Sequence, residues 1–571
     1  MMEAMSTPTM TEASTPRELA DAYVDRLVEL DTTVATALGL TKHDDRVPDF
    51  SPSAQQAMSD VAIDALARLD LLETSPPDGG WGDIDRRCAA VLRDRLQVGL
   101  EAHDAGEHLR EVRNLFGPPQ QVRQLFSLMP TESSEDWACI GRRLAKVDDA
   151  LASYVAALEE GRDRGLFAAP RQVETVIDQL TEWIQTEWFQ GFIAPGAAAY
   201  PDLADALQDG ADRATAGAAR LRDYLRSTYS LAARGTPDAV GAGRYALNAR
   251  RYTGADLDLN ETYAWGWQEF LRLRTSMSEL AEEILPGSTP IEAMHHLDTH
   301  GEVVQGVDAI QERLQQMMDQ AIEDLDGEHF DIAEPIRTVK AMIAPSGSAA
   351  APYYSRPSLD FTRPGQTWLP TLGHTSFPLY ELISTWYHEG VPGHHLQLAQ
   401  WVYLAPQLSV YQTTLGSSSG ATEGWALYAE RLMDELGYLD TQAKMGYLDC
   451  QIMRAIRVVI DIGMHLEMTI PDDSPLAPGQ RWTPDLAQEF FALHSGRPAD
   501  FIASEIVRYL GWPGQAISYK VGERAWLAGR DAAQAAAAAR GQEFDLKAWH
   551  MAALSLGAMG LADLESELGR L

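Results

Sequence analysis

Residues 387–397 read YHEGVPGHHLQ and contain side chains that could hold a catalytic metal: His388, Glu389, His394 and His395. A zinc hydrolase needs about three protein ligands, an open coordination position for water, and a carboxylate that accepts a proton from that water. Helical zinc sites usually place two histidines four residues apart, because four residues turn an α-helix by about 400° and leave both on one face. Here the fourth position after His388 is a proline, so the second histidine must reach the metal by another route.

Two histidines are candidates for the second ligand. On an ideal helix His394 lies about 240° from His388, whereas His395 lies about 20° from it but roughly 10.5 Å further along the axis. Pro392 cannot donate a backbone hydrogen bond, and Gly393 tolerates many backbone conformations. We predict a bulge that bends the helix and carries His394 to the position the fourth residue normally holds. His395 is then an alternative ligand, or it supports the site or faces the substrate.

The third ligand is expected from another helix. The segment ATEGWALYAE begins after the turn LGSSSG and offers Glu423 near a helix start. Glu430 lies seven residues later on the same face, where it could orient a ligand histidine through a hydrogen bond. Glu389 follows His388 and is therefore about 100° round the helix from it. We predict that Glu389 is the general base, since it can face a water at the metal without becoming a ligand.

Other polar groups are further candidates. Tyr519 follows a turn at Trp512 and could donate a hydrogen bond to a developing oxyanion, with Tyr509 as the alternative. One helical pattern predicts either a buried row of ion pairs or an arginine that binds a substrate carboxylate: Arg454, Arg457, Asp461 and His465. His296 and His300 also lie four residues apart, but no general base or distant carboxylate accompanies them, so we do not predict a metal site there.

The elements that must position these residues are mostly helices. Apolar residues recur at three-and-four spacing through most of residues 17–335, after a flexible N-terminus at residues 1–16. The stretch from about residue 338 to 370 is rich in β-branched and aromatic residues, which predicts a small antiparallel β element. Helices resume at Phe377, with Ser376 as the cap, Pro378 in the first turn and Glu381 near the start. We expect a helical array around a deep cleft, followed by a catalytic region at residues 336–571.

The composition limits which cellular compartment and which binding partners we expect. The chain has 571 residues, with 46 Lys and Arg against 83 Asp and Glu, and a net charge of −37. Such a charge repels nucleic acids and anionic membranes, so neither is an expected partner. The three cysteines, Cys88, Cys139 and Cys450, are far apart and form no disulfide or metal pattern. With no signal peptide and no apolar run of membrane-spanning length, we predict a cytoplasmic protein.

Four blocks, in this order, resemble a known bacterial family, domain of unknown function 885: HEGVPGHHLQ, TEGWALYAE, RAIRVVIDIGMH and RYLGWPGQAISYKVG. The resemblance spans most of the chain. The pairing of the first block with EGWA is also similar to the gluzincin peptidases, whose third zinc ligand is a glutamate in such a segment. This resemblance implies a mainly helical, zincin-like architecture with a small sheet at the substrate edge, and a Zn²⁺ cofactor.

Three functions are compatible with these residues. The first is a zinc metallopeptidase that cleaves small or unfolded peptides; the second is a zinc amidohydrolase or esterase of small molecules. The third is a helical scaffold that binds metal without catalysis. Glu389 disfavours the scaffold, because a structural zinc site closes its coordination and needs no carboxylate beside the first ligand. The sequence predicts neither an oligomeric state nor the bond that is cleaved.

Overall fold

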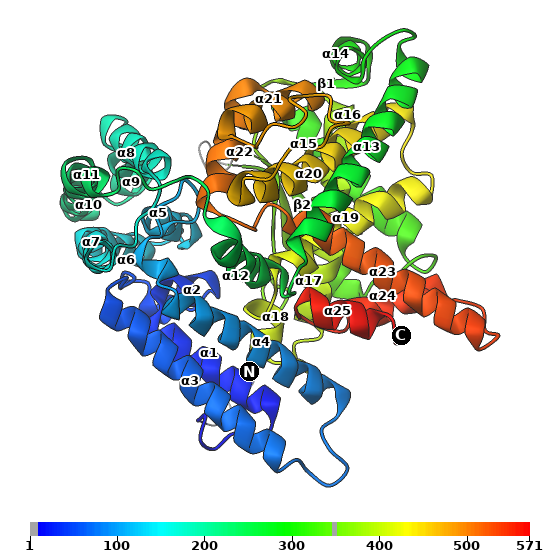
Figure 1. Ribbon diagram of the computed structural model, residues 1–571. Coiled ribbons are helices and arrows are strands. Elements are labelled where there is room, and N and C mark those ends of the chain that lie inside the picture. Colours follow the sequence, from blue (N-terminus) through cyan, green and yellow to red (C-terminus); the bar gives the residue numbers. More distant parts are fainter. Residues whose placement is uncertain (1–8, 345–350) are drawn as a thin grey trace. The chain divides into compact units, whose positions relative to one another are not determined.

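The structure is a computed structural model that describes residues 9–344 and 351–571, and it is mainly helical (Figure 1). The first eight residues of the predicted flexible N-terminus lie outside the described residues. The chain packs as two compact units, each built from several segments. Unit 1 contains residues 1–80, 96–240 and 504–512, and unit 2 contains residues 81–95, 241–503 and 513–571. Residue 335, where the sequence pattern changes, therefore lies inside unit 2.

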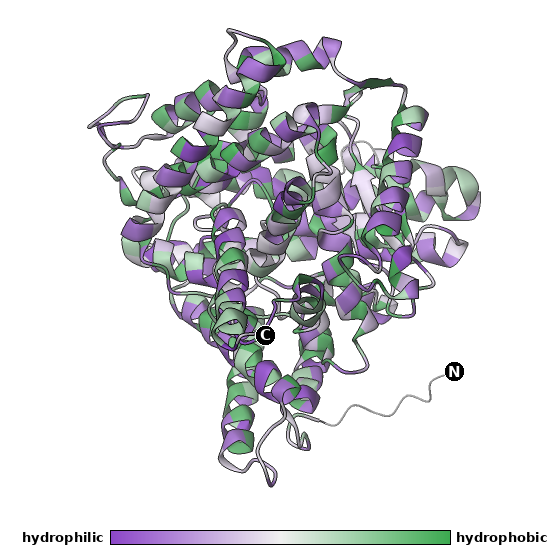
Figure 2. Ribbon diagram, turned by 90° about the vertical axis from the view of Figure 1, so that its right-hand side faces the viewer, coloured by the Kyte–Doolittle hydropathy of each residue, from purple (hydrophilic) through white to green (hydrophobic). Residues whose placement is uncertain are grey.

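Unit 1 is built from helices that bury one apolar face each, and Figure 2 shows green and purple residues side by side on single helices. In α8 (Pro170–Gln185) the buried residues include Val173, Ile177 and Leu180, which recur at helical spacing. Each such side chain contributes about 1.5–3 kcal/mol when it is fully buried. The other helices that lie wholly in this unit are α1 (Pro16–Leu30), α2 (Thr32–Ala37), α3 (Pro52–Thr74), α5 (Pro118–Leu128), α6 (Ser134–Leu144), α7 (Val147–Asp163), α9 (Trp188–Ala199), α10 (Ala204–Tyr224) and α11 (Ser230–Ala232). Two more, α4 (Asp83–Asp104) and α22 (Ala499–Gly511), have one part in each unit.

Unit 2 holds the elements that carry the candidate metal ligands. Its α16 (Leu379–Glu389) packs on α20 (Thr441–Leu466), and α19 (Ser419–Glu435) packs on α23 (Ser518–Ala539). The long α13 (Leu259–Ile284) also packs on α20. The remaining helices are α12 (Gly241–Thr253), α14 (Pro290–His300), α15 (Val307–Leu325), α17 (His394–Tyr403), α18 (Val410–Thr414), α21 (Pro484–His494), α24 (Leu546–Leu554) and α25 (Leu561–Leu568).

Two small sheets precede the helix that carries the first candidate ligand. In the first, β1 (Val303–Gln305) pairs antiparallel with β5 (Ser376–Pro378). The second has the order β2-β4-β3, where β2 is Val339–Ile343, β3 is Tyr353–Ser355 and β4 is Gly365–Leu369. The antiparallel pairing expected in this stretch is confirmed for β3 and β4, but β2 runs parallel to β4. Residues 345–350, in the middle of the predicted strand segment, lie outside the described residues.

The outer edge of β2 is covered by glutamine side chains from α15. Gln315 donates to the carbonyl of Val339 at 3.0 Å and accepts from the amide of Ala341 at 2.8 Å. Gln311 donates to the carbonyl of Ala341 at 2.8 Å. These amides satisfy backbone groups that an edge strand otherwise leaves without a partner. The other end of this sheet is β3.

The predicted start of the metal-site helix is wrong by two residues. Ser376 and Phe377 belong to β5, where their backbones pair with Gln305 and Val304, so Ser376 is not the helix cap. The helix α16 begins at Leu379, Pro378 occupies the cap position without a side-chain hydrogen bond, and Glu381 lies in the first turn as predicted. The partner strand β1 is three residues long and lies in a stretch that we expected to be helical.

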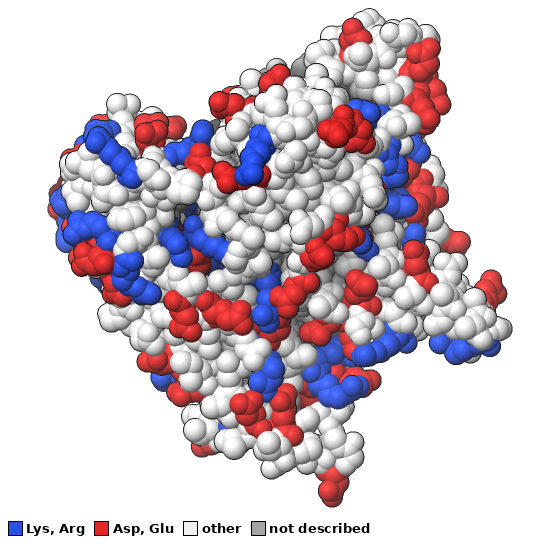
Figure 3. Space-filling view, viewed as in Figure 1, with Lys and Arg blue, Asp and Glu red and all other residues white. Residues whose placement is uncertain are grey.

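The net charge of −37 is not gathered in one tract on the face shown in Figure 3, where acidic and basic side chains are intermixed. Among residues 9–344 and 351–571, no helix combines the length and the apolar character that are needed to cross a bilayer.

Candidate metal centre

His388 and His394 lie on either side of a helix break. The helix α16 ends at Glu389 and α17 begins at His394, so the chain makes a turn where we expected a bulge within one bent helix. In this turn the Val391–Pro392 peptide bond is cis. The amide of Gly393 donates to the carbonyl of Tyr387 at 3.0 Å, and the amide of His395 donates to the carbonyl of Gly390 at 3.1 Å. A Cβ atom on Gly393 would collide with the backbone of residues 387 and 388, so the close approach requires glycine.

The helix α19 holds this turn and also carries the third candidate ligand. Ser418 caps the helix by accepting a hydrogen bond from the amide of Ala421 at 3.2 Å, which places Glu423 near the helix start as predicted. Two residues later, the indole N–H of Trp425 points to the turn and lies 2.9 Å from the carbonyl oxygen of Pro392 and 3.1 Å from that of Gly393. Glu423 and the turn before His394 are thereby positioned by the same helix.

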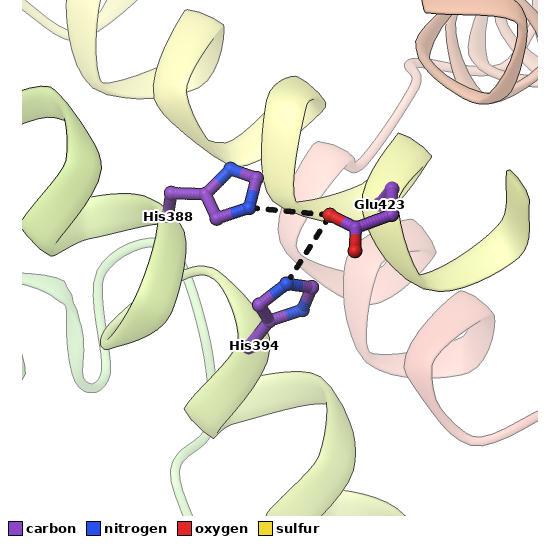
Figure 4. A group of neighbouring side chains, drawn as sticks. All are labelled: His388, His394 and Glu423. Atoms are coloured by element: carbon purple, nitrogen blue, oxygen red, sulfur yellow. Dashed lines mark ion pairs between the residues drawn. The ribbon is translucent and has the colours of Figure 1, made fainter. Parts of the chain in front are cut away.

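The three predicted ligands meet in one cluster (Figure 4). Oε2 of Glu423 lies 3.3 Å from Nε2 of His388 and 3.5 Å from Nε2 of His394. Ligand atoms bound to tetrahedral zinc at about 2.0–2.1 Å are separated by about 3.3 Å, so both distances match edges of such a tetrahedron. Oε2 of Glu423 is buried without a hydrogen bond to any described residue, as a ligand atom for a metal would be. The donor set and its spacing therefore fit zinc.

Glu430 lies behind His388 and fixes the orientation of its ring. Nδ1 of His388 donates to Oε1 of Glu430 at 2.7 Å, and Ser384 and Arg454 also donate to this fully buried carboxylate. Burial alone would raise the pKa of Glu430, but Arg454 and His388 lower it below its usual value. Burial would lower the pKa of His388, yet the neighbouring carboxylates of Glu423 and Glu430 raise it to about 9. Nε2 of His388 is left facing the cluster.

Glu389 lies at the edge of the cluster. Its carboxylate is 3.9 Å from Nε2 of His388, and the side chain is buried. Burial raises the pKa of Glu389, although His388 and His394 oppose this effect. In the described parts of the chain, the carboxylate has no hydrogen-bond partner. A buried carboxylate with a raised pKa and no hydrogen-bond partner is well suited to exchange a proton with a water or a substrate.

His395 does not join the cluster. Its Nε2 donates to the carbonyl of Ile336 at 2.7 Å, and its Nδ1 accepts from the hydroxyl of Tyr354 in β3 at 2.9 Å. Both ring nitrogens therefore have protein partners, and burial lowers the pKa of His395 to about 4. His395 ties the sheet to α17, a role that sequence reasoning missed. The sequence feature that could have indicated this contact is the aromatic pair Tyr353 and Tyr354 in the predicted β stretch.

The other predicted residues lie outside the cluster. The ring of Tyr519 lies under the guanidinium groups of Arg454 and Arg457, 5.9 and 4.9 Å from its centroid. Tyr509 is buried and donates to Glu505 at 2.6 Å. In the helical pattern at residues 454–465, Asp461 accepts a hydrogen bond from Tyr245 and lies 3.6 Å from His465. All four residues of this pattern are buried: Arg454, Arg457, Asp461 and His465. The rings of His296 and His300 stack on each other, and among the described residues only His388, His394 and Glu423 form a cluster of three or more possible ligands.

Comparison with solved structures shows that this fold has been seen before. The crystal structure of "the putative lipoprotein from Colwellia psychrerythraea" matches 98% of this chain and 99% of its own, with 21% identity and a TM-score of 0.79. A "putative lipoprotein of unknown function from Shewanella oneidensis" matches 97% of this chain and 100% of its own, with 15% identity and a TM-score of 0.70. At these identities the matches show a shared fold.

Comparison at the level of sequence gives a match to a family model. No curated protein matches the chain. The model of one family does match, and that family is described as "Bacterial protein of unknown function (DUF885)". The match runs from residue 33 to residue 568, so it covers nearly the whole chain, including both helices of the cluster and the sheets before them. The chain therefore belongs to the bacterial family DUF885.

Proposed function

We propose that the protein is a zinc-dependent peptidase that acts on small or unfolded peptides. The observation that supports this function best is the convergence of His388, His394 and Glu423, whose carboxylate lies 3.3 and 3.5 Å from the two histidines. The buried carboxylate of Glu389 lies beside them. The three ligands leave a fourth position for water or substrate, which is typical of catalytic rather than structural zinc sites. When bound, zinc would act as a Lewis acid that polarises a substrate carbonyl and makes water more acidic at the site.

The residues of the chain have separate roles in this proposal. Oε1 or Oε2 of Glu389 takes a proton from the attacking water and delivers it to the amide nitrogen that leaves. The oxygen of the water joins the carbonyl carbon, the C–N bond breaks, and one carboxyl product and one amine product result. Glu430 holds the ring of His388 in place, and Tyr519 is the candidate donor to the carbonyl oxygen as negative charge develops there.

The sheet favours a peptide over a small amide or ester. Strand β3 forms one end of the sheet β2-β4-β3, and the hydroxyl of Tyr354 in this strand joins it to His395, the residue after the second ligand. Extended peptides bind to sheet edges through backbone hydrogen bonds. An edge strand tied to the metal-binding helix therefore supports an extended substrate in this proposal.

Peptide hydrolysis and metal content of purified variants test the proposal. We expect one zinc per chain in the wild type, and its loss in His388→Ala, His394→Ala and Glu423→Ala. His395→Phe should retain zinc. Glu389→Gln should retain zinc and lose nearly all hydrolysis of a peptide library, whereas Glu381→Gln, on the same helix, should remain active. Full zinc content in the three ligand variants, or near wild-type hydrolysis by Glu389→Gln, would sink the proposal.

A further inference from the structure

Two arginines beside the edge strand β3 have no carboxylate partner among residues 9–344 and 351–571. Arg356 follows β3 directly, and Arg363 lies two residues before β4. Acidic residues outnumber basic ones by 83 to 46, yet neither arginine makes an ion pair within the part of the chain that the structure describes. Both lie close enough to Tyr354 to lower the pKa of its hydroxyl, against the burial that raises it. A local excess of positive charge therefore surrounds this end of the sheet.

Arg356 makes one hydrogen bond to the described residues, which leaves most of its N–H donors without an acceptor among them. One of its terminal N–H groups donates to the backbone carbonyl of Thr413, and the guanidinium lies 6.0 Å from the ring centroid of Trp401. Burial lowers the pKa of Arg356. The side chain of Arg356 is half-buried, and partial burial of a cation favours its pairing with an anion. The planar guanidinium matches a carboxylate, which it can bind through two parallel hydrogen bonds.

The distance of Arg356 from the metal cluster can be estimated from the rise per residue of α17. This helix begins at His394, and Trp401 follows seven residues later, about 10.5 Å along the axis. Tyr354 of β3 contacts His395 on this helix, and Arg356, the residue after β3, lies near Trp401. An extended peptide advances about 3.3 Å per residue, so about three residues would span the distance from the cluster to Arg356.

We propose that Arg356, assisted by Arg363, binds a carboxylate of the substrate, so that the enzyme cleaves peptides about two or three residues before their carboxyl end. The inference rests on the proposed peptidase function and names its substrate class. The C-terminal carboxylate of a short peptide places one charge at this distance from the scissile bond. The side chain of an aspartate at the same place is the second source of a carboxylate, and it must be distinguished experimentally.

Three forms of one peptide separate these sources. The first has a free C-terminal carboxylate, the second has a C-terminal amide, and the third is an amide with aspartate at its last position. We expect the free acid to be cleaved with a KM about 10- to 100-fold below that of the amide, as for a charge-assisted hydrogen bond. In Arg356→Gln this preference should disappear through KM, with kcat nearly unchanged. Cleavage of acid and amide with the same KM in the wild type would overturn the inference. Preference for the aspartate amide alone would also overturn it in favour of an internal acidic residue.

A second variant and a binding experiment make the test robust to misfolding and to failure of the peptidase function. Arg363→Gln removes an exposed side chain, so it should fold normally and weaken the preference in part. Arg313→Gln, which removes a half-buried arginine of α15 that lies 3.7 Å from Glu302, should retain it. Calorimetric binding of the same three peptides to Glu389→Gln measures carboxylate recognition without turnover. If peptides are not hydrolysed but the free acid still binds about 10-fold more tightly than the amide, the subsite stands and the peptidase function fails. Equal binding of acid and amide contradicts the subsite alone.

Discussion

The residues around the cluster differ in how firmly their neighbours hold them. Both ring nitrogens of His388 face carboxylates, with Glu430 on one side and Glu423 on the other. Nδ1 of His394 is buried and has no hydrogen-bond partner among the described residues. The orientation of His388 is thus imposed by hydrogen bonds, whereas that of His394 follows from its place at the first turn of α17. We expect zinc affinity to depend on Glu430 for this reason.

Glu430→Gln tests this dependence. The amide keeps the size of the side chain but accepts the Nδ1–H of His388 less strongly and leaves Arg454 without its counter-charge. Loss of such a supporting carboxylate typically lowers metal affinity about 10- to 100-fold. Competition with a chelator measures the affinity, and Glu435→Gln, near the other end of α19, is the matched control. Unchanged zinc affinity in Glu430→Gln would show that the ring is held by packing alone.

His550 should make the stability of the protein pH-dependent. It is buried, its Nε2 lies 2.8 Å from the hydroxyl of Tyr428, and burial lowers its pKa to about 3. In the unfolded chain the pKa is about 6.5, so the unfolded state binds a proton between pH 6.5 and pH 3 that the folded state does not. The contribution of His550 to stability is therefore complete above pH 6.5 and is lost as the pH falls. Between pH 6.5 and pH 5 the loss is roughly 2 kcal/mol.

Denaturant unfolding at the two pH values measures this loss. The decrease in the free energy of unfolding should be about 2 kcal/mol smaller in His550→Gln than in the wild type. His374→Gln, which removes an exposed histidine, should leave the decrease unchanged. An equal pH dependence in wild type and His550→Gln would mean that His550 is already protonated in the folded protein.

At the scale of elements, α19 assembles the site, because it carries Glu423 and also closes the turn before His394 through Trp425. Trp425→Phe removes the indole N–H and keeps an aromatic ring in the core. One net hydrogen bond contributes about 0.5–1.5 kcal/mol, so we expect zinc affinity to fall roughly three- to tenfold as the turn loosens. Trp549→Phe also removes a buried indole donor, to the carbonyl of Leu568, and should leave zinc affinity unchanged. Equal zinc affinities in the two variants would contradict this role of α19.

The sequence predicts the parts of the site that are local. The segments around His388 and Glu423 carry the ligand types and the helix signals within a few residues of each other, so their elements were foreseen. The pairing of β1 with β5 joins residues about 70 positions apart through strands of three residues, which are too short to show a periodic pattern. The contact of Tyr354 with His395 likewise spans 41 positions. Such contacts depend on how helices pack, and no local pattern records them.

At the scale of the molecule, unit 2 is built from residues before and after residue 335. The indole of Trp386 in α16 donates to the carbonyl of Leu314, and Trp482 donates to the hydroxyl of Tyr263. Lys520, which is buried, pairs with Glu269 of α13 at 2.9 Å. A fragment of residues 336–571 would expose these buried groups without their partners, which is costly for each of them.

We therefore expect the fragment 336–571 to be insoluble or unfolded and to bind no zinc, whereas the full chain binds one ion. Circular dichroism during thermal unfolding and metal analysis of both proteins measure this difference. A fragment that unfolds cooperatively and binds zinc at full stoichiometry would show that the catalytic region predicted from the sequence is an independent domain.

The glutamines that cover β2 also affect self-association. A sheet with an open edge can recruit the edge of another copy, which is a common route to aggregation. Gln311 and Gln315 close that route at β2, so strand addition is left to the β3 end of the sheet. Two copies that met there would bring Arg356 and Arg363 of each chain together, and like charges repel. The same cations that would attract an acidic peptide end thus discourage two copies of the protein from joining through this sheet.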